Sequence, residues 1–301
     1  MMFVGCGTAL VTPFRRDFSL DEKNFRMLIR RQIEAGIHFL VVCGTTGESP
    51  TLTWQERTRV VEIAIEEANG NIPVVAGAGG YNTSEVVRVV REYVSIGVDG
   101  ILSVTPYYNK PTQEGLYQHF LAIAQSISKP ILLYNVPART GVNIEPATVR
   151  RLAAIDTIVG IKEASGNISQ IASIAAGVPD DFAVLSGDDT IALPLFALGG
   201  RGLISVAANE IPSQMAELCN LCLQDSYPAA REIHERYLPL MEANFVESNP
   251  IPVKAAMAQM GLLEPIWRLP LVEPAANSAI RIQTVLENLG LLERSHAAIG
   301  N

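Results

Sequence analysis

The sequence contains few of the residues on which metal and thiol chemistry depend. Its 301 residues include four histidines and four cysteines. Cys219 and Cys222 form a C-x-x-C pair inside a helical pattern, but no second pair and no nearby histidine accompanies them. Zinc and redox sites normally need such additional ligands. We therefore predict reduced thiols in the core and no bound metal, and the scattered histidines argue against a histidine-based catalytic triad.

Long apolar runs and an excess of positive charge are also absent. No apolar stretch is long enough to span a bilayer, and the apolar N-terminus lacks the basic region and cleavage site of a secretion signal. The net charge of -8 leaves no broad basic surface for nucleic acid. We therefore expect a cytoplasmic protein that binds small metabolites, with neither a membrane nor nucleic acid as a partner.

Short β-branched runs alternate with amphipathic segments along most of the chain. Eight of these runs are almost continuously apolar, which indicates strands buried on both faces of a parallel sheet. They cover residues 7–12, 38–44, 72–79, 99–105, 131–136, 157–164, 181–187 and 202–208. Eight such units at this length predict the α/β class and a (β/α)8 TIM barrel, not an open sheet.

Capping residues mark where several of the intervening helices begin. The signals are Ser19 or Asp21, then Thr53 with Glu56 three residues later, and then Thr83 or Ser84. After about residue 224 the strand pattern stops and the remaining segments have a helical period. We therefore predict a catalytic barrel over residues 1–224 and a C-terminal helical domain over residues 225–301.

One lysine stands at an unusual place for its charge. Lys162 closes the apolar run TIVGIK, whereas the other four lysines lie in helical or loop contexts. Burial disfavours the ammonium form and lowers a lysine pKa toward the nucleophilic neutral amine. Such an amine can form an imine with a ketone, which then acts as an electron sink. The alternative is a strand-end lysine held in a salt bridge to Glu163, and the lysine alone does not decide between the two.

Two further strand ends carry groups suited to binding and proton transfer. The second run ends in GTTGES at residues 44–49, where glycines allow the backbone and two hydroxyls to approach a small carboxylate. The fifth ends in YNVPARTG, which places Tyr134 for proton transfer and Arg139 for gripping a carboxylate. A helix-capping turn, a core-edge tyrosine and a solvated arginine are the structural alternatives.

The motifs together resemble the dihydrodipicolinate synthase (4-hydroxy-tetrahydrodipicolinate synthase) family, within the N-acetylneuraminate lyase superfamily of class I aldolases. The similarity runs from GTALVTPF through GTTGESPTL, TPYYNKP, YNVPARTG, GIKEASGN and SGDD to GLISVAAN and NPIPVKAAM. The resemblance implies a lyase that condenses pyruvate with L-aspartate 4-semialdehyde in the diaminopimelate route to lysine. It also implies a homotetramer, a dimer of dimers, that needs no metal or organic cofactor.

The resemblance assigns a role to individual residues. Lys162 would form the imine with pyruvate, and Tyr134 would transfer protons through a hydroxyl relay with Thr45 and Tyr108. Tyr107 would come from a neighbouring subunit and close over the relay. The substrate-binding residues would be Thr46 for the pyruvate carboxylate, Arg139 for the carboxylate of the aldehyde, and the backbone at Gly187 and Ile204 for the pyruvate pocket.

A regulatory cleft for lysine is the last feature that the resemblance implies. Its positions correspond to Ser49, Trp54, Arg57, Tyr81, Glu85 and Tyr107. Ser49, Glu85 and Tyr107 match the lysine-sensitive members of the family. In contrast, Trp54 and Arg57 replace histidines and Tyr81 replaces an asparagine, so we expect little or no inhibition by lysine.

Two other functions fit parts of the same pattern. The first is another pyruvate-dependent aldolase of the superfamily, such as N-acetylneuraminate lyase or a 2-keto-3-deoxysugar aldolase. Arg139 argues against it, because a sugar pocket needs neutral hydroxyl partners whereas a short acidic aldehyde needs a guanidinium. The second is a barrel without catalysis, which the intact set of lysine, tyrosine and threonine residues disfavours.

Overall fold

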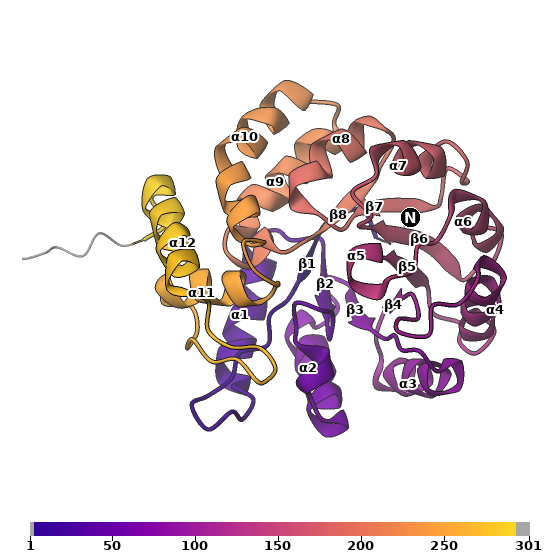
Figure 1. Cartoon of the computed structure of the whole chain (residues 1–301), viewed down its shortest axis with the longest axis horizontal. Helices are drawn as coiled ribbons and strands as arrows, with labels where there is room; N and C mark the ends of the chain where they lie inside the picture. The colour runs from indigo at the N-terminus through magenta and orange to yellow at the C-terminus, as the bar shows by residue number, and fades with distance from the viewer. Residues whose placement is uncertain (1–2, 293–301) are drawn as a thin grey trace, which may run out of the picture.

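The computed structural model describes residues 3–292 and confirms the predicted TIM barrel. Eight parallel strands close into a barrel in sequence order, with β1 paired to both β2 and β8. The helices surround this barrel in Figure 1. The strands are β1 (Gly5–Ala9), β2 (Phe39–Val42), β3 (Val74–Gly77), β4 (Gly100–Val104), β5 (Ile131–Asn135), β6 (Ile158–Glu163), β7 (Ala183–Ser186) and β8 (Gly202–Ser205). Each lies within a predicted apolar run or begins at most two residues before it.

The helices follow the strands in the order that a barrel requires, and further helices follow the last strand. Around the barrel they are α1 (Glu22–Glu34), α2 (Trp54–Ala68), α3 (Thr83–Ile96), α4 (Gln113–Ala124), α5 (Pro137–Thr140), α6 (Pro146–Leu152), α7 (Ile168–Ala175), α8 (Ala192–Ala197) and α9 (Pro212–Leu223). Then come α10 (Tyr227–Ala243), α11 (Ile251–Gln259) and α12 (Ala276–Leu289), which gather beside α1 and α9 in Figure 1. The domain boundary at residue 224 stays a prediction.

Capping residues fix where the first helices begin. The carboxylate of Asp21 accepts a hydrogen bond from Asn24 N and caps α1, and Thr53 with Glu56 forms a complete capping box on α2. The prediction for α3 was wrong by one residue. Asn82 is its N-cap, because the Asn82 side chain accepts from Ser84 N and leaves Thr83 inside the helix. An asparagine caps as well as serine or threonine does, so the three neighbouring polar residues could not be separated by type.

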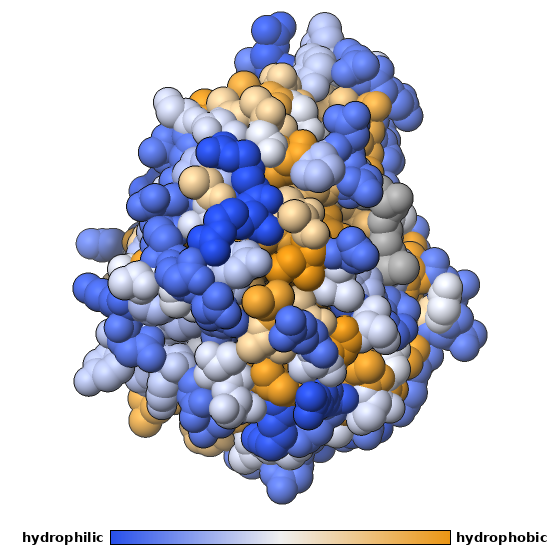
Figure 2. Space-filling view, turned by 90° about the vertical axis from the view of Figure 1, so that its right-hand side faces the viewer, coloured by the Kyte–Doolittle hydropathy of each residue, from blue (hydrophilic) through white to orange (hydrophobic). Residues whose placement is uncertain are grey.

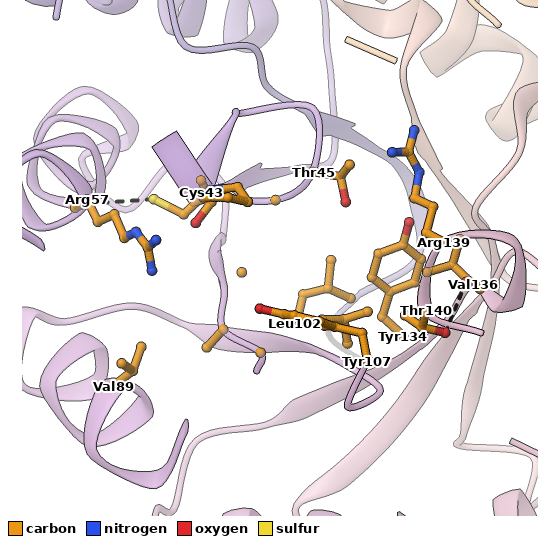
Figure 3. Close-up of a pocket in the computed structure, with 17 residues that line it drawn as sticks. Cys43, Thr45, Arg57, Val89, Leu102, Tyr107, Tyr134, Val136, Arg139 and Thr140 are labelled. Carbon is orange, nitrogen blue, oxygen red and sulfur yellow. Dashed lines mark hydrogen bonds between the residues drawn. The ribbon is translucent and has the colours of Figure 1, made fainter. Parts of the chain in front are cut away.

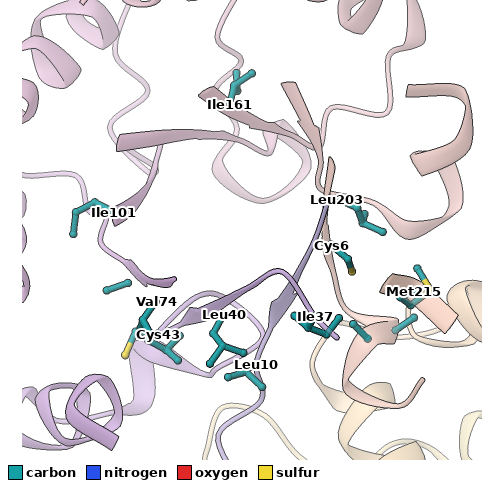
Figure 4. Packing of buried hydrophobic residues seen from close by; sticks show 14 of the residues in the cluster. Cys6, Leu10, Ile37, Leu40, Cys43, Val74, Ile101, Ile161, Leu203 and Met215 are labelled. Carbon is teal, nitrogen blue, oxygen red and sulfur yellow. The ribbon is translucent and has the colours of Figure 1, made fainter. Parts of the chain in front are cut away.

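The strand side chains divide between two layers of apolar packing. One cluster fills the barrel interior and includes Phe39, Val75, Leu132, Leu185 and Ile204. The other lies between the strands and the helices, where Figure 4 shows Ile101, Ile161 and Leu203 turned outward from the barrel. Because successive strand residues alternate between these layers, every strand is buried on both faces.

The surface carries an apolar band, and the thiols lie inside the protein. Figure 2 shows hydrophobic residues in a band on one face, bordered by hydrophilic residues. All four cysteines are buried free thiols, as predicted, and residues 3–292 contain no cluster of three or more side chains suited to a metal ion. None of the helices in the same range combines the length and apolar character needed to cross a bilayer.

Candidate active site

Lys162 and Tyr134 are paired by the register of two neighbouring strands. Their Cα atoms are partners between β6 and β5, so both side chains point to the same side of the sheet. Lys162 Nζ lies 4.4 Å from the centre of the Tyr134 ring. Both residues are buried, with 6% and 7% of their surface exposed. The sequence prediction that these two groups lie together is therefore met in the structure.

Glu163 does not neutralise Lys162. As the next residue on β6, it faces away from the barrel interior, where it accepts hydrogen bonds from Asn135 Nδ2 at 2.9 Å and Ser165 N at 2.7 Å. Within residues 3–292, no carboxylate lies within 4.0 Å of Lys162 Nζ. The salt-bridge alternative from the sequence therefore has no support, and Lys162 is a buried amine without a counter-ion in the described chain.

Gly187 provides room for the lysine side chain. A Cβ at this position would lie 2.9 Å from Lys162 Cε and 2.6 Å from Ala164 Cβ. Such separations are too short for any side chain to be accepted without a shift of Lys162. Ile204 lies in the same inner apolar cluster as Tyr134. Both predicted pocket residues therefore border the interior in which the lysine lies.

A cavity of about 420 Å³ opens at the ends of the strands next to this pair. It is lined by Thr45, Tyr134, Arg139 and Tyr107, among other residues. In Figure 3 the Tyr134 hydroxyl points toward the space between Thr45 and Arg139. Lys162 is not a lining residue and lies beside the cavity, against the Tyr134 ring. The volume suits small metabolites, and Arg139 has no acidic partner within 4.0 Å in the described chain.

Asn249 connects two of the predicted binding residues, a role that no local pattern in the sequence indicates. Its Nδ2 donates to Thr46 Oγ1 at 3.0 Å, and its backbone carbonyl accepts from an Arg139 guanidinium nitrogen at 3.1 Å. Thr46 is 3% exposed and does not line the cavity directly. The motif NPIPVKAAM contributes to the family resemblance, but a contact over 203 positions cannot be derived from local spacing.

The two tyrosines after β4 take places other than those predicted. Tyr107 lines the cavity of its own chain, whereas Tyr108 is 88% exposed. The backbone of Tyr108 is left-handed, with a φ of 67°, which sends consecutive side chains in different directions. The structure therefore does not bring Tyr108 to Thr45 and Tyr134 within one chain, and Tyr107 needs no neighbouring subunit to reach the cavity.

Five of the six predicted cleft residues line a second cavity of about 330 Å³. They are Trp54, Arg57, Tyr81, Glu85 and Tyr107, while Ser49 lines the first cavity. Arg57 and Tyr107 border both cavities. The indole of Trp54 stacks on Tyr93 of α3 with ring centres 5.5 Å apart. Arg57 has no acidic partner within 4.0 Å in residues 3–292, and its buried Nε has no hydrogen-bond partner there.

Cys43 is the one thiol that lines the first cavity, and it is not suited to act as a nucleophile. Burial raises the pKa of this thiol to about 12, and its Sγ donates to the Arg57 carbonyl at 3.7 Å. Because the thiolate is the reactive form, Cys43 is unreactive at neutral pH. Cys43 is therefore no candidate for the nucleophile of this cavity.

Comparisons with known proteins point to one family. The model described as the dihydrodipicolinate synthetase family matches residues 2–289. A 4-hydroxy-tetrahydrodipicolinate synthase from Koribacter versatilis (strain Ellin345) is 50% identical over 299 residues, covering 99% of this chain and all of the relative. A crystal structure of dihydrodipicolinate synthase from Thermotoga maritima is 46% identical with a TM-score of 0.95, covering 97% of this chain and 100% of that one. A crystal structure of the Cyanidioschyzon merolae enzyme with lysine bound is 40% identical with a TM-score of 0.93. The match covers 97% of this chain and 99% of that one.

Proposed function

The chain belongs to the dihydrodipicolinate synthetase family, and from this premise we propose that Lys162 carries out the family's condensation of pyruvate with L-aspartate 4-semialdehyde. The family consists of Schiff-base-forming lyases of the class I aldolase type, and this chain is one of them. One observation carries the assignment of the lysine. Lys162 is buried against Tyr134 at the barrel mouth and has no carboxylate partner in the described chain.

The first half of the proposed reaction forms an enamine. The neutral amine of Lys162 attacks the C2 carbonyl of pyruvate, and loss of water leaves a protonated imine. This imine withdraws electrons, so that the C3 methyl group loses a proton and becomes the enamine carbon. Tyr134 is placed to donate and accept these protons, because its ring touches the lysine and its hydroxyl faces the cavity.

The second half joins the aldehyde and releases the enzyme. The enamine carbon forms a bond to C4 of L-aspartate 4-semialdehyde, whose oxygen takes up a proton. The amino group of the same substrate then attacks the imine carbon, closes the ring and expels the Lys162 amine. We assign Arg139 to the carboxylate of the aldehyde and Thr46 to that of pyruvate, with Thr45 in the proton relay. No metal or organic cofactor has a step to perform.

Several further statements are proposals on the same basis. We propose a homotetramer built as a dimer of dimers, a cytoplasmic location, and a division into a barrel over residues 1–224 and a helical domain over residues 225–301. The band of exposed hydrophobic residues in Figure 2 supports association with further copies, since such patches often mark interfaces. Tyr108, 88% exposed beside the cavity rim, is available to a neighbouring copy.

A turnover assay with pyruvate and a panel of aldehydes tests the proposed substrate. We expect L-aspartate 4-semialdehyde to be consumed at least about a hundredfold faster than neutral sugar aldehydes at equal concentration, because the Arg139 guanidinium gains a charge-assisted pair only with the acidic aldehyde. Faster turnover of N-acetylmannosamine or glyceraldehyde would instead assign the chain to a sugar-acid aldolase activity. Arg139→Leu is expected to reduce the preference.

Lysine is expected to inhibit this enzyme weakly or not at all. The guanidinium of Arg57, which has no acidic partner among residues 3–292, borders the cleft, where it would face the ammonium groups of the ligand. Like charges about 4 Å apart and partly screened repel by around 1 to 4 kcal/mol, which lowers affinity roughly tenfold to several hundredfold. We therefore expect half-inhibition only above about 1 mM at saturating pyruvate.

Two substitutions test whether the positive charge of Arg57 weakens lysine binding in this cleft. Arg57→His removes the permanent charge and is expected to increase sensitivity to lysine. Arg88→His is the matched control, because Arg88 lines the same cavity but is already paired with Glu92 at 2.7 Å. Submillimolar inhibition of the unmodified enzyme, or equal effects of the two substitutions, would contradict this explanation.

A further inference from the structure

A buried ion pair connects the C-terminal helices to the loop that carries Thr45 and Thr46. Lys254 on α11 is fully buried, and Glu48, directly after the threonines and Gly47, is 2% exposed. Lys254 Nζ lies 2.5 Å from Glu48 Oε1 and 4.4 Å from the centre of the Phe14 ring. Burial lowers the pKa of Lys254, and the charge of Glu48 opposes that shift. The pair therefore joins α11 to the turn that carries the two threonines.

Glu48 holds the far end of the threonine turn in an unusual conformation. Its φ is 51°, in the left-handed region that residues with a side chain rarely adopt. Its backbone N donates to the Thr45 carbonyl at 3.1 Å, which closes the turn over Thr46 and Gly47. The Glu48 carbonyl accepts from Thr51 N at 2.9 Å. The residue whose side chain pairs with Lys254 is therefore also the residue whose backbone closes the turn of both threonines.

A second contact from the same C-terminal segment reaches the turn independently. Asn249, five residues before Lys254, donates from Nδ2 to Thr46 Oγ1 at 3.0 Å. The C-terminal segment therefore contacts the turn at two points, at Thr46 through Asn249 just before α11 and at Glu48 through Lys254 on α11. Buried ion pairs add little net stability compared with apolar residues of the same volume, and their best-attested benefit is a fixed geometry. Because Glu48 closes the turn that carries Thr45 and Thr46, the geometry that this pair fixes is that of the threonine turn.

We propose that Lys254 is a positioning residue for pyruvate binding: through Glu48 it fixes the turn on which Thr45 and Thr46 meet the substrate. This inference rests on the proposed function of the site. It also gives the C-terminal helices a part in substrate binding, since α11 supplies the lysine that pairs with Glu48. Lys254 itself touches no reacting atom.

The test compares two double variants in the full-length enzyme. Lys254→Met/Glu48→Met removes both buried charges and keeps unbranched side chains, so it avoids an unpaired charge and adds no branched residue at the left-handed position. Arg26→Met/Glu67→Met is the control, because it removes a half-buried ion pair between α1 and α2. Thermal unfolding, kcat and the KM for pyruvate are measured for both, and borohydride trapping of pyruvate is measured for the unmodified enzyme.

We expect the Lys254→Met/Glu48→Met enzyme to unfold near the temperature of the unmodified enzyme and to require at least about tenfold more pyruvate for half-maximal rate. This factor corresponds to the loss of one hydrogen bond to a charged ligand. Its kcat at saturating pyruvate should fall less than KM rises, because Lys162 and Tyr134 are unchanged. The control variant should keep the normal KM.

The outcomes separate this inference from the function on which it rests. A folded double variant with a normal pyruvate KM, while pyruvate is trapped on Lys162 of the unmodified enzyme, overturns the positioning role alone. Absence of trapping in the unmodified enzyme removes the proposed function and this inference together. If the double variant does not fold, Glu48→Gln keeps the shape and one acceptor oxygen, and a normal KM in that enzyme also overturns the proposal.

Discussion

Replacing Lys162 with alanine is expected to lower kcat by roughly four orders of magnitude or more, as when other enzymes lose a covalent nucleophile. Among residues 3–292 this side chain supplies the only amine that lies against Tyr134, and without it no imine with pyruvate can form at this position. The substitution breaks no ion pair, because Lys162 has none within residues 3–292. Loss of activity should therefore occur in a protein that still folds.

Two measurements make this expectation specific. Lys23→Ala is the matched control, since Lys23 is an exposed lysine on α1 and its loss should leave kcat unchanged. Circular dichroism and thermal unfolding of Lys162→Ala should resemble those of the unmodified enzyme. An enzyme that keeps more than about a tenth of its kcat without Lys162 cannot depend on an imine at this position.

The second large effect is expected at Tyr134. Tyr134→Phe should slow turnover by roughly a hundredfold or more, as is usual when a general acid–base group is lost. Phenylalanine keeps the ring that lies 4.4 Å from Lys162 Nζ, so the variant removes the hydroxyl and leaves the packing. The rate of imine formation, measured separately in single-turnover experiments, should fall together with kcat.

Another buried tyrosine provides the control for this substitution. Tyr237 on α10 is 6% exposed, similar to Tyr134, and does not line the cavity. Tyr237→Phe should leave turnover within about twofold of normal. Near-normal turnover of Tyr134→Phe would remove Tyr134 from the mechanism and leave Thr45 as the nearest candidate for proton transfer at the cavity.

The barrel and the centre of the site were predictable because their signals are local. Each strand is a continuous apolar run, and Lys162, Tyr134 and Arg139 are polar exceptions at or just beyond the ends of such runs. In a barrel, strand ends meet at one rim, so residues far apart in sequence come together without any further assumption. The choice between an imine-forming Lys162 and a salt bridge to Glu163 stayed open in the sequence, and the structure decides it by placing the two side chains on opposite faces of β6.

The remaining features depend on conformations and contacts that no local pattern contains. The left-handed backbone at Tyr108 decides which of two adjacent tyrosines enters the cavity, and their types do not reveal it. Similarly, Asn249 and Lys254 act on a turn about 200 residues earlier. Such contacts arise only when the C-terminal helices pack against the barrel.

Treatment of the unmodified enzyme with pyruvate and borohydride, followed by peptide mass mapping, tests the Schiff-base assignment most directly. Borohydride reduces an imine to a stable amine, so the lysine that reacts carries a permanent adduct of the pyruvate skeleton. We predict a single adduct on Lys162, formed only in the presence of pyruvate. An adduct on Lys254 or any other lysine, or no adduct at all, would contradict the assignment.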